Sequence, residues 1–279
     1  NPVAGAPSTL VADLGLGQKL APPRKPADVL GSVLPDIARA TGLDPGTPVH
    51  CGIHDSNASL LPHLMREHAP FSVVSTGTWV VVMAVGASPV TLDPARDTLV
   101  NVNAFGDPVP SARFMGGREF DILTGGRIAE PTNEDVTSVL VSKSMLLPAV
   151  VPGTGPFAHQ KARWQGAEPP LGSGQRQVAI GFYLALMTAT CLRLVGHQGP
   201  VFVEGPFAQD DRYLQMLSVV MDAPVAASSS ATGTSQGAAL LAGAELPQSA
   251  FVTRKPTDLP YAAEMISYAR AWEEHTASI

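Results

Sequence analysis

The chain has 279 residues, of which 45% are apolar and 15% charged, a composition typical of a globular protein with one large or two ordinary domains. Its net charge of −6 and the lack of a Lys/Arg cluster argue against nucleic acid as a partner, because nucleic-acid-binding surfaces are usually basic. The longest apolar run, residues 178–195, is interrupted by Thr188, Thr190 and Arg193 and does not resemble a membrane span. We therefore expect a cytoplasmic protein with neither a nucleic-acid nor a membrane partner.

The first 70 residues are predicted to form two helices around one strand. Apolar residues recur every three or four positions over residues 25–41, which predicts an amphipathic helix ended by Gly42. Residues 49–53 are predicted to be a buried strand and residues 56–67 a helix. The best internal boundary of the chain follows at residues 68–70.

From residue 71 onward, strands alternate with helices, which indicates an α/β fold. Strands are predicted at residues 71–74, 79–85, 99–104, 200–204 and 224–227. Helices are predicted up to residue 123 after a glycine turn at 114–118, and then at residues 134–143, 175–197, 210–221, 234–244 and 261–275. The passage 151–174 is rich in proline and glycine and is predicted to be a long loop that lines a surface or a cleft. The two cysteines, Cys51 and Cys191, both lie in apolar runs and are predicted to be buried thiols rather than a disulfide.

Asp55 is the first candidate functional residue, because it follows the predicted strand at residues 49–53. Folds of the α/β class bind ligands at the carboxyl ends of their strands, and a carboxylate there could accept a proton from a substrate. The alternative is that Asp55 only caps the helix that follows it.

A metal site is a further alternative, since His50, His54, Asp55, His63 and His68 are close in sequence. Four residues along a strand span roughly 13 Å, so His50 and His54 cannot readily bind one ion. A metal hydrolase is therefore the least favoured interpretation, and we assign no metal ligand.

Two polar turns follow other predicted strands. Residues 75–78 (Ser-Thr-Gly-Thr) offer backbone N–H groups and hydroxyls, as a phosphate-binding turn or a plain hairpin would. Residues 204–207 (Glu-Gly-Pro-Phe) could let a flat ring approach the backbone at the glycine, although a packed turn would look the same. The sequence contains neither a P-loop motif nor a Gly-x-Ser-x-Gly motif, which argues against P-loop enzymes and α/β-hydrolases.

The order of these motifs resembles the FGGY family of carbohydrate kinases, within the actin-like ATPase superfamily. The resemblance covers the whole chain and rests on five segments, which are PVHCGIHDSNAS (48–59), STGTW (75–79), FMGGRE (114–119), VFVEGPFAQ (201–209) and TSQGAALLA (234–242). It implies a ribonuclease H-like actin-type ATPase fold and ATP-dependent phosphorylation of a sugar or polyol hydroxyl, with Mg²⁺ accompanying the nucleotide.

The resemblance also implies roles for single residues. Asp55 matches the family's catalytic base, beside His54 in the substrate site. The implied nucleotide-binding residues are Gly77 and Thr78 at the phosphates, Gly116 and Gly117 in the next loop, Gly205, Pro206 and Phe207 against adenosine, and Asp210 in place of a frequent Asn. Two of these depart from the family pattern: Pro206 replaces a glycine and removes a backbone donor, and Asp210 replaces an amide with a group that only accepts.

The resemblance divides the chain into residues 1–70, the C-terminal segment of the first, sugar-binding domain, and residues 71–279, the second, nucleotide-binding domain. The Asp-x-Gly-Thr turn with which family members open does not occur here. The chain as it stands is therefore expected to be inactive as a kinase, and the alternative is a non-catalytic nucleotide- or sugar-binding relative. The motif variants lean towards fuculose- and rhamnulose-type kinases, and a homodimer is the default expectation for a soluble enzyme.

Overall fold

The computed structural model describes residue 2 and residues 4–228, 233–246 and 251–277. The chain divides into two compact units, which we describe one by one. Unit 1 comprises Asn1–Arg66, Asn101–Pro108 and Thr232–Gln248, and unit 2 comprises Glu67–Val100, Val109–Ala231 and Ser249–Ile279.

Unit 1 is built from short helices and strands. They are α1 (Thr9–Asp13), η1 (Gly17–Lys19), β1 (Val29–Ser32), α2 (Pro35–Thr41), β2 (Pro48–His50), α3 (Asp55–Arg66) and α8 (Gly233–Leu241). The single helix predicted over residues 25–41 is wrong, because its first half is β1, which pairs antiparallel with β2. Pro35 occupies the first turn of α2, where its missing N–H costs nothing, and Gly42 ends that helix in the left-handed conformation, as predicted.

The strand before Asp55 is also shorter than predicted. It ends at His50, and its residues are exposed or half-buried rather than buried. Cys51 likewise is exposed, so the prediction of two buried thiols holds only for Cys191.

Helices α3 and α8 pack closely at Gly237 in unit 1. A Cβ at this position would fall far inside contact distance of the carbonyl oxygen of Ala58 on α3. Only glycine therefore permits this helix crossing, which supports the helix that begins at Asp55.

We expect Gly237→Ala to force α3 and α8 apart and to destabilise their packing by about 2 kcal/mol, as overpacking of a tight contact does. Hydrogen exchange of the α3 backbone amides measures this loss. Gly17→Ala is the matched control, because a Cβ at Gly17 meets nothing within 4 Å and its effect should stay within about 0.5 kcal/mol. Unchanged exchange in the Gly237 variant would contradict the prediction.

Unit 2 is built on a seven-stranded mixed sheet in the order β11-β10-β9-β3-β4-β6-β5. The strands are β3 (Phe71–Thr76), β4 (Val80–Val85), β5 (Thr98–Val102), β6 (Pro108–Phe114), β9 (Val201–Glu204), β10 (Val225–Ser228) and β11 (Phe251–Arg254). A small sheet pairs β7 (Met145–Leu147) with β8 (Arg163–Gln165). The predicted α/β class is confirmed, but β6, β7, β8 and β11 were not predicted, and β8 lies inside the passage expected to be a loop.

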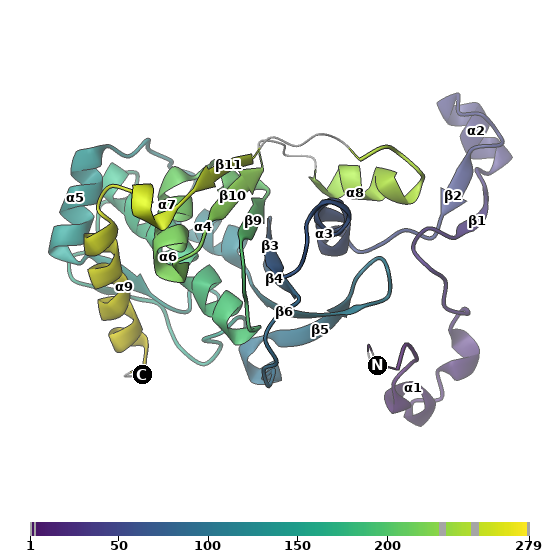
Figure 1. Cartoon of the computed structure of the whole chain (residues 1–279), viewed down its shortest axis with the longest axis horizontal. Helices are drawn as coiled ribbons and strands as arrows, with labels where there is room; N and C mark the ends of the chain where they lie inside the picture. The colour runs from purple at the N-terminus through teal and green to yellow at the C-terminus, as the bar shows by residue number, and fades with distance from the viewer. Residues whose placement is uncertain (1, 3, 229–232, 247–250, 278–279) are drawn as a thin grey trace. The chain divides into compact units, whose positions relative to one another are not determined.

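The helices of unit 2 are α4 (Gly116–Thr124), α5 (Asn133–Ser142), α6 (Gly174–Leu194), α7 (Asp211–Met221) and α9 (Ala262–Ala277), with short 3-10 turns η2 (Pro94–Arg96), η3 (Pro206–Gln209) and η4 (Pro256–Asp258). Helix α6 contacts β4 and α7 contacts β10, so these helices cover the sheet (Figure 1). Helix α6 has the length and composition of a membrane span, but 78% of its apolar window is buried, as in the core helix of a globular domain.

Candidate active site

Three turns of unit 2 meet at one edge of its large sheet. Strands β3 and β9 are parallel neighbours, with Ser75 opposite Glu204. Strand β6 runs in the same direction as β3, because both are antiparallel to β4. The chain therefore leaves β3, β6 and β9 at the same edge, where strands of α/β folds present their ligand sites.

Glycines let these turns approach one another. A Cβ on Gly117, at the start of α4, would overlap the carbonyl oxygen of Gly77 in the turn after β3. A Cβ on Gly205, after β9, would overlap the carbonyl oxygen of Thr76, and the φ of Gly205 is +88°, a conformation that favours glycine. The predicted glycine motifs thus serve close backbone contacts between the three turns.

The turns border a cavity of about 730 Å³. Six of the predicted nucleotide-binding residues line it, namely Gly77, Thr78, Gly117, Pro206, Phe207 and Asp210. Gly116 and Gly205 are not among the lining residues. A Cβ on Gly116 would overlap the Val80 side chain, so this glycine permits the packing beneath the turns.

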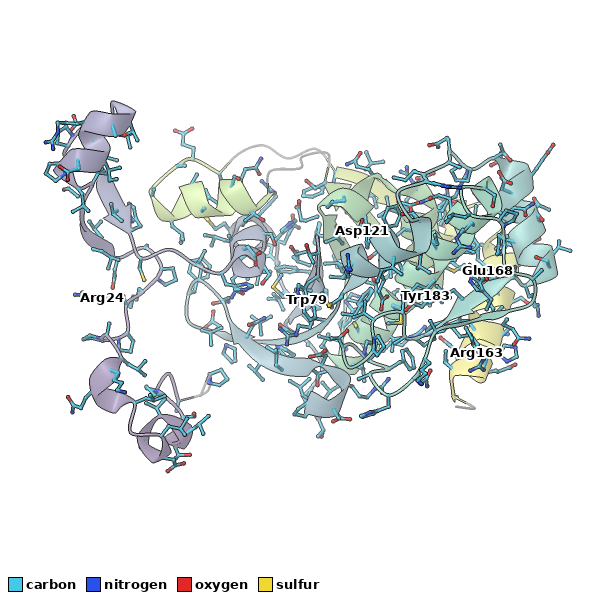
Figure 2. All side chains as sticks on the ribbon, turned by 180° about the vertical axis from the view of Figure 1, so that it is seen from behind. Arg24, Trp79, Asp121, Arg163, Glu168 and Tyr183 are labelled. Atoms are coloured by element: carbon cyan, nitrogen blue, oxygen red, sulfur yellow. The ribbon has the colours of Figure 1, made fainter. Side chains whose placement is uncertain are left out.

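Further lining residues were not predicted from the sequence. They are Phe120, Asp121, Ile128, Ala129, Glu130, Pro131, Gln177, Gln209, Asp211 and Arg212. The residues next to Gly117 and Asp210 could have been expected at the cavity because they are neighbours of the predicted turns. Residues 128–131 and Gln177 are distant in sequence, and only the tertiary fold brings them to the cavity. Trp79, labelled in Figure 2 together with Asp121, does not line the cavity, and the Arg113 guanidinium lies 4.7 Å from its ring centroid.

Asp210 caps helix α7 beside the cavity. Its Oδ1 accepts hydrogen bonds from the backbone N–H groups of Arg212 at 2.9 Å and Tyr213 at 3.2 Å. Burial raises the pKa of this carboxyl, although both hydrogen bonds oppose the shift. Phe207 forms an apolar wall beside it, with ring centroids 6.0 Å from Phe120 and 5.4 Å from Tyr213.

Glu119 is in the first turn of α4, two residues after Gly117, and is 1% exposed. Tyr183, labelled in Figure 2, donates its hydroxyl to Glu119 Oε2 at 2.9 Å, and the backbone N–H of Val151 donates to Oε1 at 3.2 Å. Burial raises the pKa of Glu119 from 4.5 to about 7, against the opposing effect of these hydrogen bonds. The side chain therefore ties α4 to α6 and to the segment after β7.

This pKa shift predicts how the stability of unit 2 depends on pH. Below pH 4.5 the carboxyl is protonated in both the folded and the unfolded chain, and Glu119 causes no loss of stability. Between pH 4.5 and 7 only the unfolded chain ionises, so the folded state loses about 3 kcal/mol by pH 8. In Glu119→Gln the amide oxygen can accept from Val151 and the amide N–H can donate to the Tyr183 hydroxyl, so both contacts remain without the charge. Urea unfolding of both proteins at pH 4.5 and 8 should show the variant gaining this amount relative to wild type, and a pH-independent difference would contradict it.

Asp55 and His54 belong to unit 1, at the start of α3. The Asp55 side chain is 76% exposed, and its Oδ1 accepts a hydrogen bond from the backbone N–H of Ser56 at 2.6 Å. His54 Nδ1 lies 2.9 Å from this carboxylate oxygen and 2.9 Å from the Ser56 hydroxyl. Because Asp55 and the cavity lie in different units, its predicted role as the base of the reaction stays a prediction.

The predicted metal alternative gains no support from the described residues, since no three His, Cys, Asp or Glu side chains among them form a group that could hold an ion. His63, one of the five residues considered, is buried in α3 with 1% of its surface exposed.

Comparison with known proteins places this chain in a family. The C-terminal domain of the FGGY carbohydrate kinases matches residues 68–250. A carbohydrate kinase from Novosphingobium aromaticivorans is 34% identical, with a TM-score of 0.79 over 100% of this chain and 62% of that protein. No match was found among curated protein sequences.

More distant solved structures share the fold. A ligand-bound xylulose kinase from Lactobacillus acidophilus is 14% identical, with a TM-score of 0.73 over 98% of this chain and 60% of that protein. A gluconate kinase from the same organism is 15% identical, with a TM-score of 0.71 over 96% of this chain and 59% of that protein.

The fold is that of the actin-like ATPases, as predicted, and it includes the C-terminal domain of such a protein. The chain belongs to the FGGY family of carbohydrate kinases. It spans about 60% of the length of the solved structures that it matches.

Proposed function

We propose that this chain supplies the nucleotide-binding part of an ATP-dependent kinase that phosphorylates a sugar or polyol hydroxyl. The observation that carries the proposal is the meeting of three glycine-containing turns around one cavity of unit 2. Backbone N–H groups in tight turns and at a helix start bind phosphates well, because they present several donors to one anion.

Each side of the cavity has its own role in this proposal. Gly77, Thr78 and the start of α4 at Gly117 bind the phosphates, and the turn at Pro206 and Phe207 packs against adenosine. Asp210 borders the part of the cavity that would hold the adenine base, although its Oδ1 already caps α7. Mg²⁺, when bound with the nucleotide, would neutralise charge on its phosphates.

Asp55 acts as the general base in this proposal. Its carboxylate would accept the proton from the attacking hydroxyl while the γ-phosphoryl group is transferred to the hydroxyl oxygen and ADP leaves. Such a base typically contributes about 10²–10⁴-fold in rate. The neighbouring His54 would help to bind the substrate, and the exposure of the Asp55 carboxylate leaves it accessible to a hydroxyl.

The organisation of the protein is part of the same proposal. Residues 1–70 would complete a first, sugar-binding domain and residues 71–279 would form the second, with the FGGY C-terminal domain match beginning at residue 68. We expect a cytoplasmic enzyme, a homodimer as the default assembly, and a substrate of the fuculose or rhamnulose type.

The alternative function is a non-catalytic nucleotide-binding relative. Pro206 favours it, because proline removes a backbone donor beside the cavity. Asp210 favours this alternative too. Its carboxylate already caps α7, and it accepts hydrogen bonds but cannot donate one to the adenine base of a nucleotide.

Calorimetry with MgADP, followed by an assay of ADP release from MgATP with a panel of sugars and polyols, tests the proposal. Both measurements are made on the chain and on a fusion that adds the N-terminal part of the Novosphingobium kinase. We expect the chain to bind MgADP and the fusion to release ADP only with a sugar or polyol. Binding without sugar-stimulated release would favour the alternative, and no binding would overturn both.

A further inference from the structure

Thr76, the last residue of β3, directly precedes one of the turns around the cavity and is hydrogen-bonded to both sides of another. Its side chain is buried, with 7% exposed, and its Oγ1 donates a hydrogen bond to the carbonyl oxygen of Glu204 at 2.6 Å. The same oxygen accepts a hydrogen bond from the backbone N–H of Phe207 at 3.1 Å. One hydroxyl therefore binds the chain on both sides of Gly205.

These bonds continue the contact between β3 and β9 beyond the end of the strand ladder. The paired residues end with Ser75 opposite Glu204, and each strand then leads into one of the turns that border the cavity. At this point Gly205 passes so close to the carbonyl oxygen of Thr76 that only a glycine fits. The hydroxyl and the glycine together hold the turn at residues 205–207 directly against the start of the turn at residues 77–78.

We infer that Thr76 is a positioning residue, whose hydroxyl fixes the distance between the phosphate-binding turn at Gly77 and the adenosine-binding turn at Phe207. This inference rests on the proposed nucleotide site. A nucleotide spans both turns at once, whereas adenosine or pyrophosphate alone would contact one of them. Fixed spacing therefore favours the intact nucleotide, because the protein pays less ordering cost when both halves of the site are already in place.

Removing the hydroxyl should leave two buried backbone groups without this partner. Thr76→Val keeps the size of the side chain but can neither donate to Glu204 nor accept from Phe207. Unsatisfied buried groups are costly, so the turn at residues 205–207 should shift or become mobile relative to the turn at residues 77–78. Thr76→Ser keeps the hydroxyl and should keep the spacing.

The experiment measures the affinity of the whole chain for MgADP, adenosine and pyrophosphate by ligand titration. We expect Thr76→Val to weaken MgADP binding by about tenfold or more, while adenosine and pyrophosphate each change by less than about threefold. Thr76→Ser should stay within about threefold for all three ligands. Thr76→Ala replaces the valine variant if that protein does not fold.

Thr188→Val is the matched control, because Thr188 is also buried and its hydroxyl accepts a hydrogen bond from Tyr213 at 3.0 Å. It lies within α6, is absent from the cavity lining, and should leave MgADP affinity unchanged. Equal losses for all three ligands in the Thr76→Val protein, or equal losses in the control, would show a general structural role and overturn the inference.

Hydrogen exchange of the Phe207 amide gives a readout without ligand. It should become faster in Thr76→Val and remain slow in Thr76→Ser. If the wild-type chain binds no MgADP while this exchange pattern is seen, the proposed function fails and the contact itself is still demonstrated. If MgADP binds but Phe207 exchanges equally in all variants, the inference about Thr76 fails alone.

Discussion

Replacing Asp55 with Asn should lower sugar phosphorylation by at least about a hundredfold and leave MgADP affinity within about twofold. The amide has nearly the same shape as the carboxylate but cannot accept the proton of the attacking hydroxyl. Asp55 lies at the start of α3 in unit 1 and is not among the residues that line the cavity of unit 2, so the substitution does not alter the cavity lining. Steady-state rates and calorimetry on the fusion with the Novosphingobium N-terminal part measure both quantities.

Asp36→Asn is a suitable control for this experiment. Asp36 is also an exposed carboxylate in the first turn of a unit 1 helix, where it pairs with Arg39. Surface ion pairs contribute little, so this variant should retain the wild-type rate. If Asp55→Asn also retains it, Asp55 is not the base, and another group must accept the proton.

The turns that border the cavity could be predicted from the sequence because each of them is a local feature. Small polar and glycine residues directly follow strands, and strands of α/β folds end where ligands bind. The turns after β3 and β9 lie as expected because the strands themselves were recognised from short runs of buried valine and phenylalanine. The contacts of Gly117 with Gly77 and of Gly205 with Thr76 join residues far apart in sequence, and only the fold shows them.

The segment before Asp55 was predicted poorly for a physical reason. Apolar residues at three- and four-residue spacing favour a helix over residues 25–41, but the same residues can alternate along a short strand. Pro35 disfavours the helical conformation at Leu34 and starts a new helix, which separates β1 from α2. Pairing with β2, a non-local contact, then fixes the first half as a strand.

Glu119 shows a second limit of prediction from sequence. It stands in the first turn of α4, where a glutamate is usually exposed and favourable for the helix dipole. Its burial follows from Tyr183, 64 residues later, and from Val151, both of which bond to it only in the folded chain. A buried carboxyl cannot be recognised when its partners are this distant in sequence.

Gly117→Ala and Gly77→Ala should distinguish an effect on the stability of the protein from an effect on MgADP binding. A methyl group at residue 117 must push the Gly77 carbonyl away, so this variant should lose about 2 kcal/mol of stability and at least about tenfold in MgADP affinity. A methyl group at residue 77 has no atom nearer than the Trp79 carbonyl oxygen at 3.9 Å, and it should leave stability unchanged or slightly raised.

The two variants therefore differ in stability but should agree in binding. Gly77 lines the cavity, so the added methyl group would stand where the phosphates must approach the backbone, and MgADP affinity should again fall at least about tenfold. Urea unfolding and calorimetry of both proteins provide the comparison. If Gly77→Ala binds MgADP like wild type, phosphates do not approach this turn, whatever the stability of Gly117→Ala proves to be.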